Sequence, residues 1–268
     1  MSRGYDARRK AKRQQARAAA EPPPRQSPTG SRRAVVLLPV LAIAAILVAT
    51  AIVGLGAGNG SSPKQIDQEV TALLAGIPQR GPTLGSPDAP VTLRMFADLE
   101  CPTVKRFVES YLPSIISDWV RTGTVKLEYR SLKTDTVDER IFFDQEEAAL
   151  AAGRQSRMWN FALTFVRQQG PHFTEYANDA FLTHIASQVP ELSMRRWNRD
   201  RKDISLFKPI ALSVHSAHAQ GLRYTPSFVT VGYTDTASVQ EELIASLEKD
   251  IQALSAEASG DVPILKVG

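Results

Sequence analysis

The chain has 268 residues, 43% of them hydrophobic and 22% charged, a composition typical of a globular protein rather than of a disordered or fibrous one. Residues 1–33 carry ten Lys or Arg and two acidic residues, a net charge of +8, so the net charge of +4 for the whole chain leaves −4 for the remainder. This distribution disfavours a basic nucleic-acid-binding domain, and we expect no nucleic acid among the partners.

A charge-free segment extends from Ala34 to Pro63, and residues 34–56 are almost continuously apolar. About 20 such residues are enough for a helix that crosses a membrane, so we predict a transmembrane helix over 34–56. The tail at 1–33 lacks the apolar residues of a folded core and is predicted to be disordered. Because Arg32 and Arg33 abut the apolar segment, the positive-inside rule places this tail in the cytoplasm and the rest of the chain outside.

A cleaved signal peptide is the alternative interpretation of this segment, but its charged region and its apolar core would both be unusually long. We therefore expect a retained anchor in a single-pass protein of the cell membrane. The C-terminal domain is expected to be extracytoplasmic.

The segment after the predicted anchor begins with a Gly- and Ser-rich stretch, and residues 57–66 are predicted to be a linker. Apolar residues at helical spacing between Gln65 and Ala75 indicate a helix that packs on the domain that follows. We place this folded domain at residues 67–257 and a C-terminal tail at 258–268.

The chain contains one cysteine, Cys101, so no disulfide can form within it. In a domain outside the cytoplasm, such a thiol is either buried and inert or reactive toward other molecules. A strand-like run at about 91–98 precedes Cys101, and apolar residues at helical spacing follow it from Val104 to Trp119. Cys101 is thus expected at a strand-to-helix junction, and Pro113 is expected to kink the helix.

The start of this predicted helix favours an ionised thiol at Cys101. Pro102 suits the first helical turn, and the N–H groups and dipole of a helix N-terminus stabilise a thiolate. Lys105 and Arg106 add positive charge one turn into the helix, while Glu100 opposes them.

The remaining pattern indicates two further strands at about 125–132 and 227–232, a long helical middle and a terminal helix. Together these elements make an α/β or α+β domain. The aromatic residues of the helical middle are expected in its core rather than on a peptide-binding surface. They are Trp159, Phe161, Phe165, Phe173, Tyr176 and Phe181.

Two histidines, His215 and His218, lie three residues apart on a predicted helix and could supply two metal ligands. No second pair of ligands has matching spacing, so we interpret them as surface residues and expect no metal site. A hydrolase built on a Cys–His pair would also need an orienting group and oxyanion donors that the sequence does not identify.

The stretch GSPDAPVTLRMFADLECPTVKRF resembles the opening strand and active-site helix of the DsbA-like branch of the thioredoxin-fold thiol–disulfide oxidoreductases, in its membrane-anchored bacterial form. The family pattern is Phe-x-Asp-x-x-Cys-Pro-x-Cys-x-x-Phe. Val104 stands where the second cysteine belongs, so the active-site motif reads Cys101-Pro102-Thr103-Val104. The positions that match the pattern are Phe96, Asp98, Cys101, Pro102 and Phe107.

The resemblance continues toward the C-terminus. VKLEYRSLK matches the second strand, a helical insert follows at about 144–220, and Thr225-Pro226 in GLRYTPSFVTVG matches the family's cis-proline loop. The resemblance implies an α/β, thioredoxin-like fold with an inserted helical subdomain, preceded by one transmembrane helix. It also implies that Tyr224, Thr225 and Pro226 bind substrate, with a cis proline that faces Cys101 across a shallow groove.

The function that the resemblance implies is thiol–disulfide exchange by one catalytic residue, Cys101, without a cofactor. A second cysteine would resolve the mixed disulfide, and Val104 cannot do so. The expected partners are extracytoplasmic client proteins with thiols or disulfides, and an external thiol donor or redox partner. The alternative is a degenerate thioredoxin-fold module that binds a protein partner and catalyses nothing.

Overall fold

The computed structural model describes residues 62–231, 245–249 and 265–267. The predicted cytoplasmic tail at 1–33 and the predicted transmembrane helix at 34–56 lie outside these residues. Within the described ranges, every helix is too short or too polar to cross a membrane.

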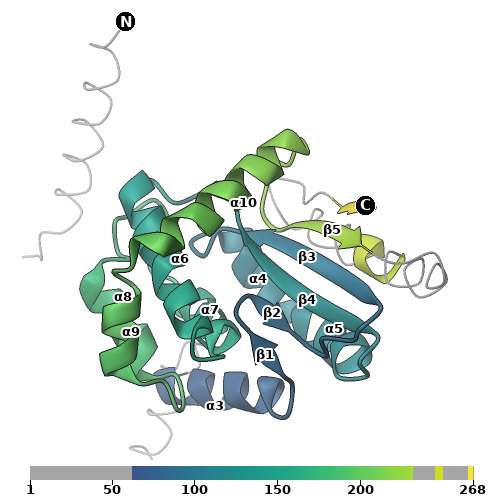
Figure 1. Cartoon of the computed structure of the whole chain (residues 1–268), viewed down its shortest axis with the longest axis horizontal. Coiled ribbons are helices and arrows are strands. Elements are labelled where there is room, and N and C mark those ends of the chain that lie inside the picture. The colour runs from purple at the N-terminus through teal and green to yellow at the C-terminus, as the bar shows by residue number, and fades with distance from the viewer. Residues whose placement is uncertain (1–61, 232–244, 250–264, 268) are drawn as a thin grey trace, which may run out of the picture. The chain divides into compact units, whose positions relative to one another are not determined.

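The described strands form a six-stranded mixed sheet in the order β1-β2-β4-β3-β5-β6 (Figure 1). Two parallel pairs, β3 with β4 and β5 with β6, are joined by the antiparallel pairing of β3 with β5, and β1 and β2 extend the sheet beyond β4. The strand bounds are Gln79–Arg80 for β1, Thr83–Leu84 for β2, Val91–Ala97 for β3, Val125–Ser131 for β4, Ser227–Val231 for β5 and Leu265–Val267 for β6.

The three strands predicted from the apolar pattern are confirmed as β3, β4 and the described part of β5. The sequence predicted a C-terminal tail at 258–268. Within it, Leu265–Val267 instead form a strand, β6, that pairs with β5. A three-residue strand is too short to show a period-2 pattern.

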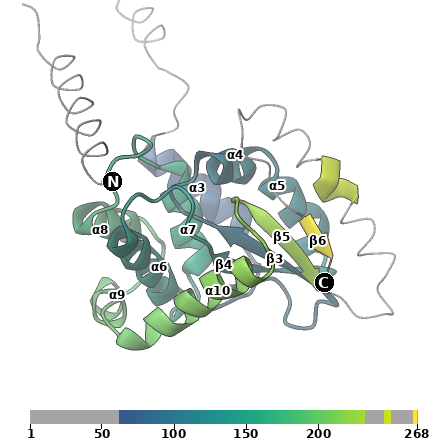
Figure 2. The same ribbon diagram turned by 90° about the horizontal axis from the view of Figure 1, so that it is seen from above.

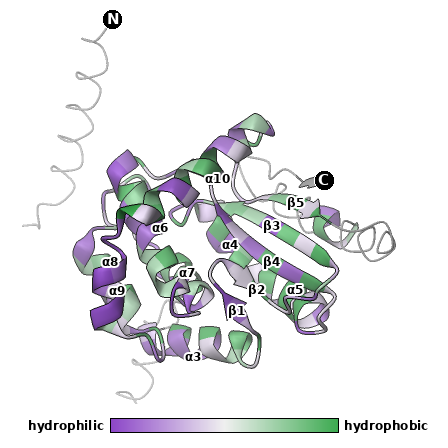
Figure 3. Cartoon of the chain, viewed as in Figure 1, coloured by the Kyte–Doolittle hydropathy of each residue, from purple (hydrophilic) through white to green (hydrophobic). Residues whose placement is uncertain are grey.

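Hydrophobic side chains cover both faces of the sheet. Buried and half-buried residues alternate along β4, and Figure 3 shows the corresponding alternation in hydropathy. On one face, Leu93 and Met95 of β3 pack in the main core with residues of α4 (Pro102–Ser110). On the other face, Phe96 packs with Ala217 of α10 (Phe207–Ala219). Figure 2 shows α4 and α10 on these opposite sides.

The helix expected after the linker is α3 (Pro63–Leu74). A capping box fixes its start, since the Ser62 hydroxyl accepts from Gln65 N–H and the Gln65 side chain accepts from Ser62 N–H at 2.8 Å. Its apolar face is buried and packs on α7 (Met158–Arg167). The linker predicted over 57–66 is therefore too long, and the helix replaces it from Pro63.

The helix that follows Cys101 is interrupted where a kink was expected. α4 ends at Ser110, and Tyr111 leaves helical geometry with φ −121° and ψ −37°. A short α5 (Leu112–Ile115) and a π-helical turn, η1 (Ile116–Val120), continue the chain. Pro113 accounts for the break, because a proline ring clashes with the carbonyl four residues earlier.

The helical insert gathers beside the sheet (Figure 1). It begins at Glu139 rather than near 144, because Asp138 caps α6 by accepting from the N–H groups of Arg140 and Ile141. Its elements are α6 (Glu139–Gly153), α7, α8 (Asp179–Ser187), α9 (Met194–Asp200), the 3₁₀ turn η2 (Ile204–Leu206) and α10.

Most of the insert's aromatic residues are covered, as predicted. Trp159, Phe161 and Phe165 are buried on α7, and Tyr176 and Phe181 are half-buried against them. Phe173 is the exception and is 68% exposed, because it lies in the loop between α7 and α8 rather than on a helix.

A buried carboxyl group lies between α6 and β4. Glu146 accepts hydrogen bonds from the Tyr129 hydroxyl at 2.7 Å and from the Ser131 hydroxyl at 2.6 Å. Burial outweighs these two contacts and raises the pKa of Glu146 to about 8.

Only part of the predicted terminal helix falls within the described chain. Residues 245–249 are helical, and Leu247 is fully buried in the main core.

Candidate functional site

Cys101 is the N-cap of α4, at the strand-to-helix junction where the sequence placed it. Pro102 is exposed and occupies the first helical turn, Thr103 is half-buried, and Val104 is 1% exposed in the core. Cys101 itself is only 4% exposed. Its thiol donates a hydrogen bond to the carbonyl oxygen of Thr225 at 3.4 Å.

The Thr225-Pro226 peptide bond is cis, as predicted. Phe96 near the end of β3 pairs with Ser227 at the start of β5, so antiparallel pairing brings the two flanking loops to one edge of the sheet. Thr225 and Pro226 are buried there, and Tyr224 is 40% exposed beside them. The structure thus brings Cys101 and the predicted substrate-binding loop together.

A third loop, residues 133–136, is held against the site by Asp98. The fully buried Asp98 carboxylate accepts from the N–H groups of Thr134, Asp135 and Thr136 at 2.8 to 2.9 Å, and from the Thr136 hydroxyl at 2.6 Å. It also accepts from Glu100 N–H at 3.0 Å. Asp98 was recognised in the sequence as a motif position, and the structure shows that it anchors the 133–136 loop.

A fourth segment, the loop between α7 and α8, contacts the same site. The Gln169 side-chain amide donates to the carbonyl oxygens of Leu99 at 2.7 Å and Cys101 at 3.0 Å. His172 Nε2 lies 2.8 Å from Asp135 Oδ1. Sequence reasoning missed Asp135, Gln169 and His172, because residues in loops carry no periodic signal.

The electrostatic environment of Cys101 is opposite to the one expected. Burial of the thiol, followed by the negative charge of Asp135, raises the pKa of Cys101 to about 12. Hydrogen bonds from Thr225 and from the Val104 backbone act in the opposite direction and are outweighed. The backbone N–H of Val104 at the helix start does favour the thiolate, as predicted, but desolvation of the buried sulfur outweighs it.

The neighbouring acid, Glu100, is also perturbed. Burial, with the charges of Asp98 and Asp135, raises the pKa of Glu100 to about 7, and Lys133 partly offsets these effects. Glu100 is 4% exposed, and its Oε1 atom is buried without a hydrogen-bond partner among the described residues. A neutral carboxyl group is therefore favoured beside the thiol below about pH 7.

No cluster of three or more potential metal ligands occurs among the residues that the structure describes. His215 and His218 lie exposed on α10. Cys101 is the one cysteine of the chain, so Val104 leaves the site with a single thiol.

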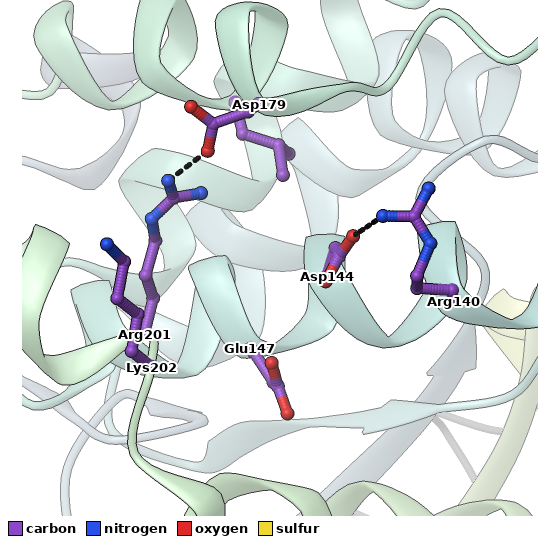
Figure 4. A pocket seen from close by; sticks show the side chains of 7 residues that line it. Arg140, Asp144, Glu147, Asp179, Arg201 and Lys202 are labelled. Carbon is purple, nitrogen blue, oxygen red and sulfur yellow. Dashed lines mark hydrogen bonds and ion pairs between the residues drawn. The ribbon is translucent and has the colours of Figure 1, made fainter.

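A separate cavity of about 310 Å³ lies within the helical insert (Figure 4). Four of its charged residues form ion pairs, Arg140 with Asp144 at 3.6 Å and Arg201 with Asp179. None of its lining residues belongs to the Cys101 site. They are Arg140, Asp144, Glu147, Asp179, Leu182, Arg201 and Lys202.

Comparison with known proteins identifies related sequences and folds. Residues 79–249 match a family model described as thioredoxin. Disulfide bond formation protein D of Bacillus subtilis (strain 168) is 32% identical over 78 residues, which cover 29% of this chain and 31% of that protein. The match thus spans about a third of this curated relative.

A solved structure shows the same fold. Oxidised BdbD from Bacillus subtilis aligns with a TM-score of 0.52 and 18% identity, over 64% of this chain and 97% of that chain. Wolbachia pipientis alpha-DsbA1 aligns with a TM-score of 0.48 and 19% identity, over 61% of this chain and 78% of that one.

Proposed function

The chain belongs to the thioredoxin family, and from this premise we propose that it is a DsbA-like thiol–disulfide exchange protein that works with one thiol, Cys101. The observation that carries the proposal is the contact of 3.4 Å between the Cys101 thiol and the carbonyl of Thr225. An extended client chain that pairs with the backbone beside Pro226 would bring its own disulfide to this sulfur.

The proposed step needs no oxidant. Cys101 loses its proton to solvent, and the thiolate attacks one sulfur of a client disulfide. The client S–S bond breaks, a mixed disulfide forms, and the second client sulfur leaves as a thiolate. Another client thiol then attacks the mixed disulfide and isomerises the client, or two external thiols in succession reduce it. Val104 cannot supply the resolving sulfur.

A second candidate function is favoured by the pKa of about 12 at Cys101. At neutral pH, a thiol with this pKa is ionised in about one molecule in 10⁵, and only the thiolate attacks a disulfide. A module that binds a protein partner through the same loops would need no thiolate at all.

Trapping experiments with the full-length chain separate these two functions. We expect wild-type protein to form client adducts that a reductant releases and that are absent in Cys101→Ser. Ser110→Ala, at the exposed end of α4, is the matched control and should behave as wild type. Partner association that persists in Cys101→Ser and resists reductant would instead establish the binding module.

We also propose that residues 34–56 anchor the protein in the cell membrane, with the tail at 1–33 in the cytoplasm and the clients outside. The charge asymmetry of the sequence supports this topology. A reporter fused to the C-terminus should be exported and remain in the membrane fraction. Release of a shortened soluble form would contradict the anchor.

A further inference from the structure

Another cavity, of about 460 Å³, lies at the end of the sheet that is remote from Cys101. It is lined by residues of the β1–β2 hairpin, of the turn after β2 and of the start of β4. Lys126, which lines it from β4, pairs with Thr92 near the start of β3, whereas Cys101 follows the other end of β3. The cavity is therefore separate from the thiol site.

The backbone that lines this cavity is fixed by Gly85. Its φ of +114° is a conformation that residues with a Cβ rarely adopt. A Cβ at this position would lie 3.0 Å from Val120 Cγ1 and 3.2 Å from the Cα of Lys126, so only glycine lets the turn rest directly on β4. Its N–H donates to the carbonyl oxygen of Pro78 at 2.9 Å and closes the β1–β2 hairpin.

The ammonium group of Lys126 is held at the cavity by backbone carbonyls. Nζ donates to the carbonyl oxygen of Pro87 at 2.8 Å and to that of Ala89 at 3.1 Å. An ammonium group has three N–H donors, so one remains for a ligand. Lys126 thus contributes a positioned charge together with a free donor.

Two further donors line the cavity from the hairpin. They are the guanidinium group of Arg80 in β1 and the hydroxyl group of Thr83 in β2. Within the described part of the chain, neither side chain has a hydrogen-bond or ion-pair partner. Both are therefore available to a ligand.

The positive charge of the cavity is not neutralised by a lining carboxylate among the described residues. Glu128 lies two residues beyond Lys126 and thus on the same face of β4, but it pairs with Arg94 at 2.9 Å and with Arg130 at 2.7 Å. Asp88 is exposed and does not line the cavity. Two cations without an acid contrast with the net charge of −4 that the chain carries after residue 33.

We propose that this cavity binds a phosphate monoester. Such a group carries a charge of about −1.5 to −2 at neutral pH and offers three acceptor oxygens. It can accept from Arg80, Thr83 and Lys126 together, whereas a carboxylate has one charge and two oxygens and would leave part of this donor set unused. The cavity volume falls within the range of roughly 300 to 1,000 Å³ that is usual for small-molecule sites, so it also has room for the organic part of the ester.

A phosphate monoester reaches the protein from one of two sources, a dissolved ester or the headgroup of phosphatidic acid in a bilayer. Both present the same group to Arg80 and Lys126. Glycerol 3-phosphate carries the chemistry that they share and serves as the probe.

The first experiment titrates the full-length chain in detergent micelles with glycerol 3-phosphate at low ionic strength, by isothermal titration calorimetry. We expect saturable binding that weakens as salt is added, and none with glycerol. Arg80→Ala and Lys126→Gln should each bind the probe about tenfold more weakly, because each loses a charge-assisted hydrogen bond. Arg195→Ala, at an exposed position on α9, is the matched control and should bind as wild type.

The second experiment separates the two sources. The full-length chain is placed in phosphatidylcholine nanodiscs with or without phosphatidic acid, and modification of Lys126 by an amine reagent is measured by mass spectrometry relative to the exposed Lys208. Protection of Lys126 by phosphatidic acid would identify the lipid headgroup as the ligand. Protection by dissolved glycerol 3-phosphate alone would identify a soluble ester, and either result supports the inference.

Absence of saturable binding of glycerol 3-phosphate would overturn the inference, as would equal affinity of Arg80→Ala and wild type for the probe. If Lys126→Gln does not fold, the comparison of Arg80→Ala with Arg195→Ala still decides. Neither readout involves the Cys101 thiol, so failure to trap clients would reject the proposed function without changing these results.

Discussion

The side-chain hydroxyls of Thr134 and Thr225 lie 2.7 Å apart and join the loop after β4 to the cis-proline loop before β5. The carbonyl oxygen of the same Thr225 accepts a hydrogen bond from the Cys101 thiol at 3.4 Å. Asp98 holds Thr134 in turn, at 2.8 Å. The position of the carbonyl above the thiol is therefore set by a chain of contacts that ends in a buried carboxylate.

Asp98→Asn tests this chain of contacts. An amide can present only one acceptor oxygen, and its NH₂ group would oppose backbone N–H donors that are buried around it. We expect the free energy of unfolding to fall by about 3 kcal/mol, measured by urea denaturation of the full-length chain. Asp88→Asn, on an exposed loop, should change it by less than about 0.5 kcal/mol. Equal effects of the two variants would contradict the role of Asp98.

Glu146 gives a testable pH dependence of stability. Its pKa is raised from 4.5 to about 8 on folding, so between these values the folded chain keeps a proton that the unfolded chain releases. The free energy of unfolding must then decrease as pH rises through this range and level off above it.

In Glu146→Gln, this decrease should be smaller by up to about 5 kcal/mol, at about 1.4 kcal/mol for each pKa unit. Denaturation at a series of pH values measures it. The decrease caused by Glu100, whose pKa is raised to about 7, should remain. Glu175→Gln, on an exposed loop, should leave the profile unchanged.

The reactivity of Cys101 should increase steeply with pH. A pKa of about 12 means that the thiolate fraction rises about tenfold for each pH unit, well beyond neutrality. We expect the rate of reaction with a disulfide reagent to rise without a plateau from about pH 8 to pH 10. A plateau near neutral pH would show instead that the thiol is already ionised there, and Cys101→Ser gives the background rate.

Val104→Cys should restore a resolving thiol. Val104 follows Cys101 by one helical turn, and its backbone contacts the Cys101 thiol. We expect an intramolecular disulfide, detected by mass spectrometry under oxidising conditions, and fewer trapped client adducts than in wild type. Val104→Ala is the matched control. It has no sulfur to attack the mixed disulfide, so the yield of trapped client adducts should stay at the wild-type level. Adducts that persist in Val104→Cys would contradict the proposed geometry.

Local pattern was sufficient to predict the elements that flank the site. The alternation in β4 and the helical spacing after Cys101 depend on residues that are near one another in sequence. Pro113 predicted the helix break for the same reason. The cis bond at Thr225-Pro226 came from the resemblance, because no local rule specifies it.

The environment of Cys101 could not be predicted in the same way. Tertiary packing of two loops places Asp135 near the thiol and His172 against Asp135, and both residues are more than 30 positions from Cys101 along the chain. The charges that are close in sequence, Lys105 and Arg106, suggested an activated thiol. Burial of the sulfur, which depends on the whole fold, reverses the sign of the prediction.

For the proposed anchor, the early start of α3 would limit the distance between the folded domain and the bilayer. With the proposed anchor ending at residue 56 and the helix beginning at Pro63, six residues remain to connect them. Even fully extended, six residues span about 20 Å. α3 is packed on α7 and cannot add to this length without leaving the core. The proposed active site would therefore stay close to the bilayer, and client proteins would have to reach it at the membrane surface.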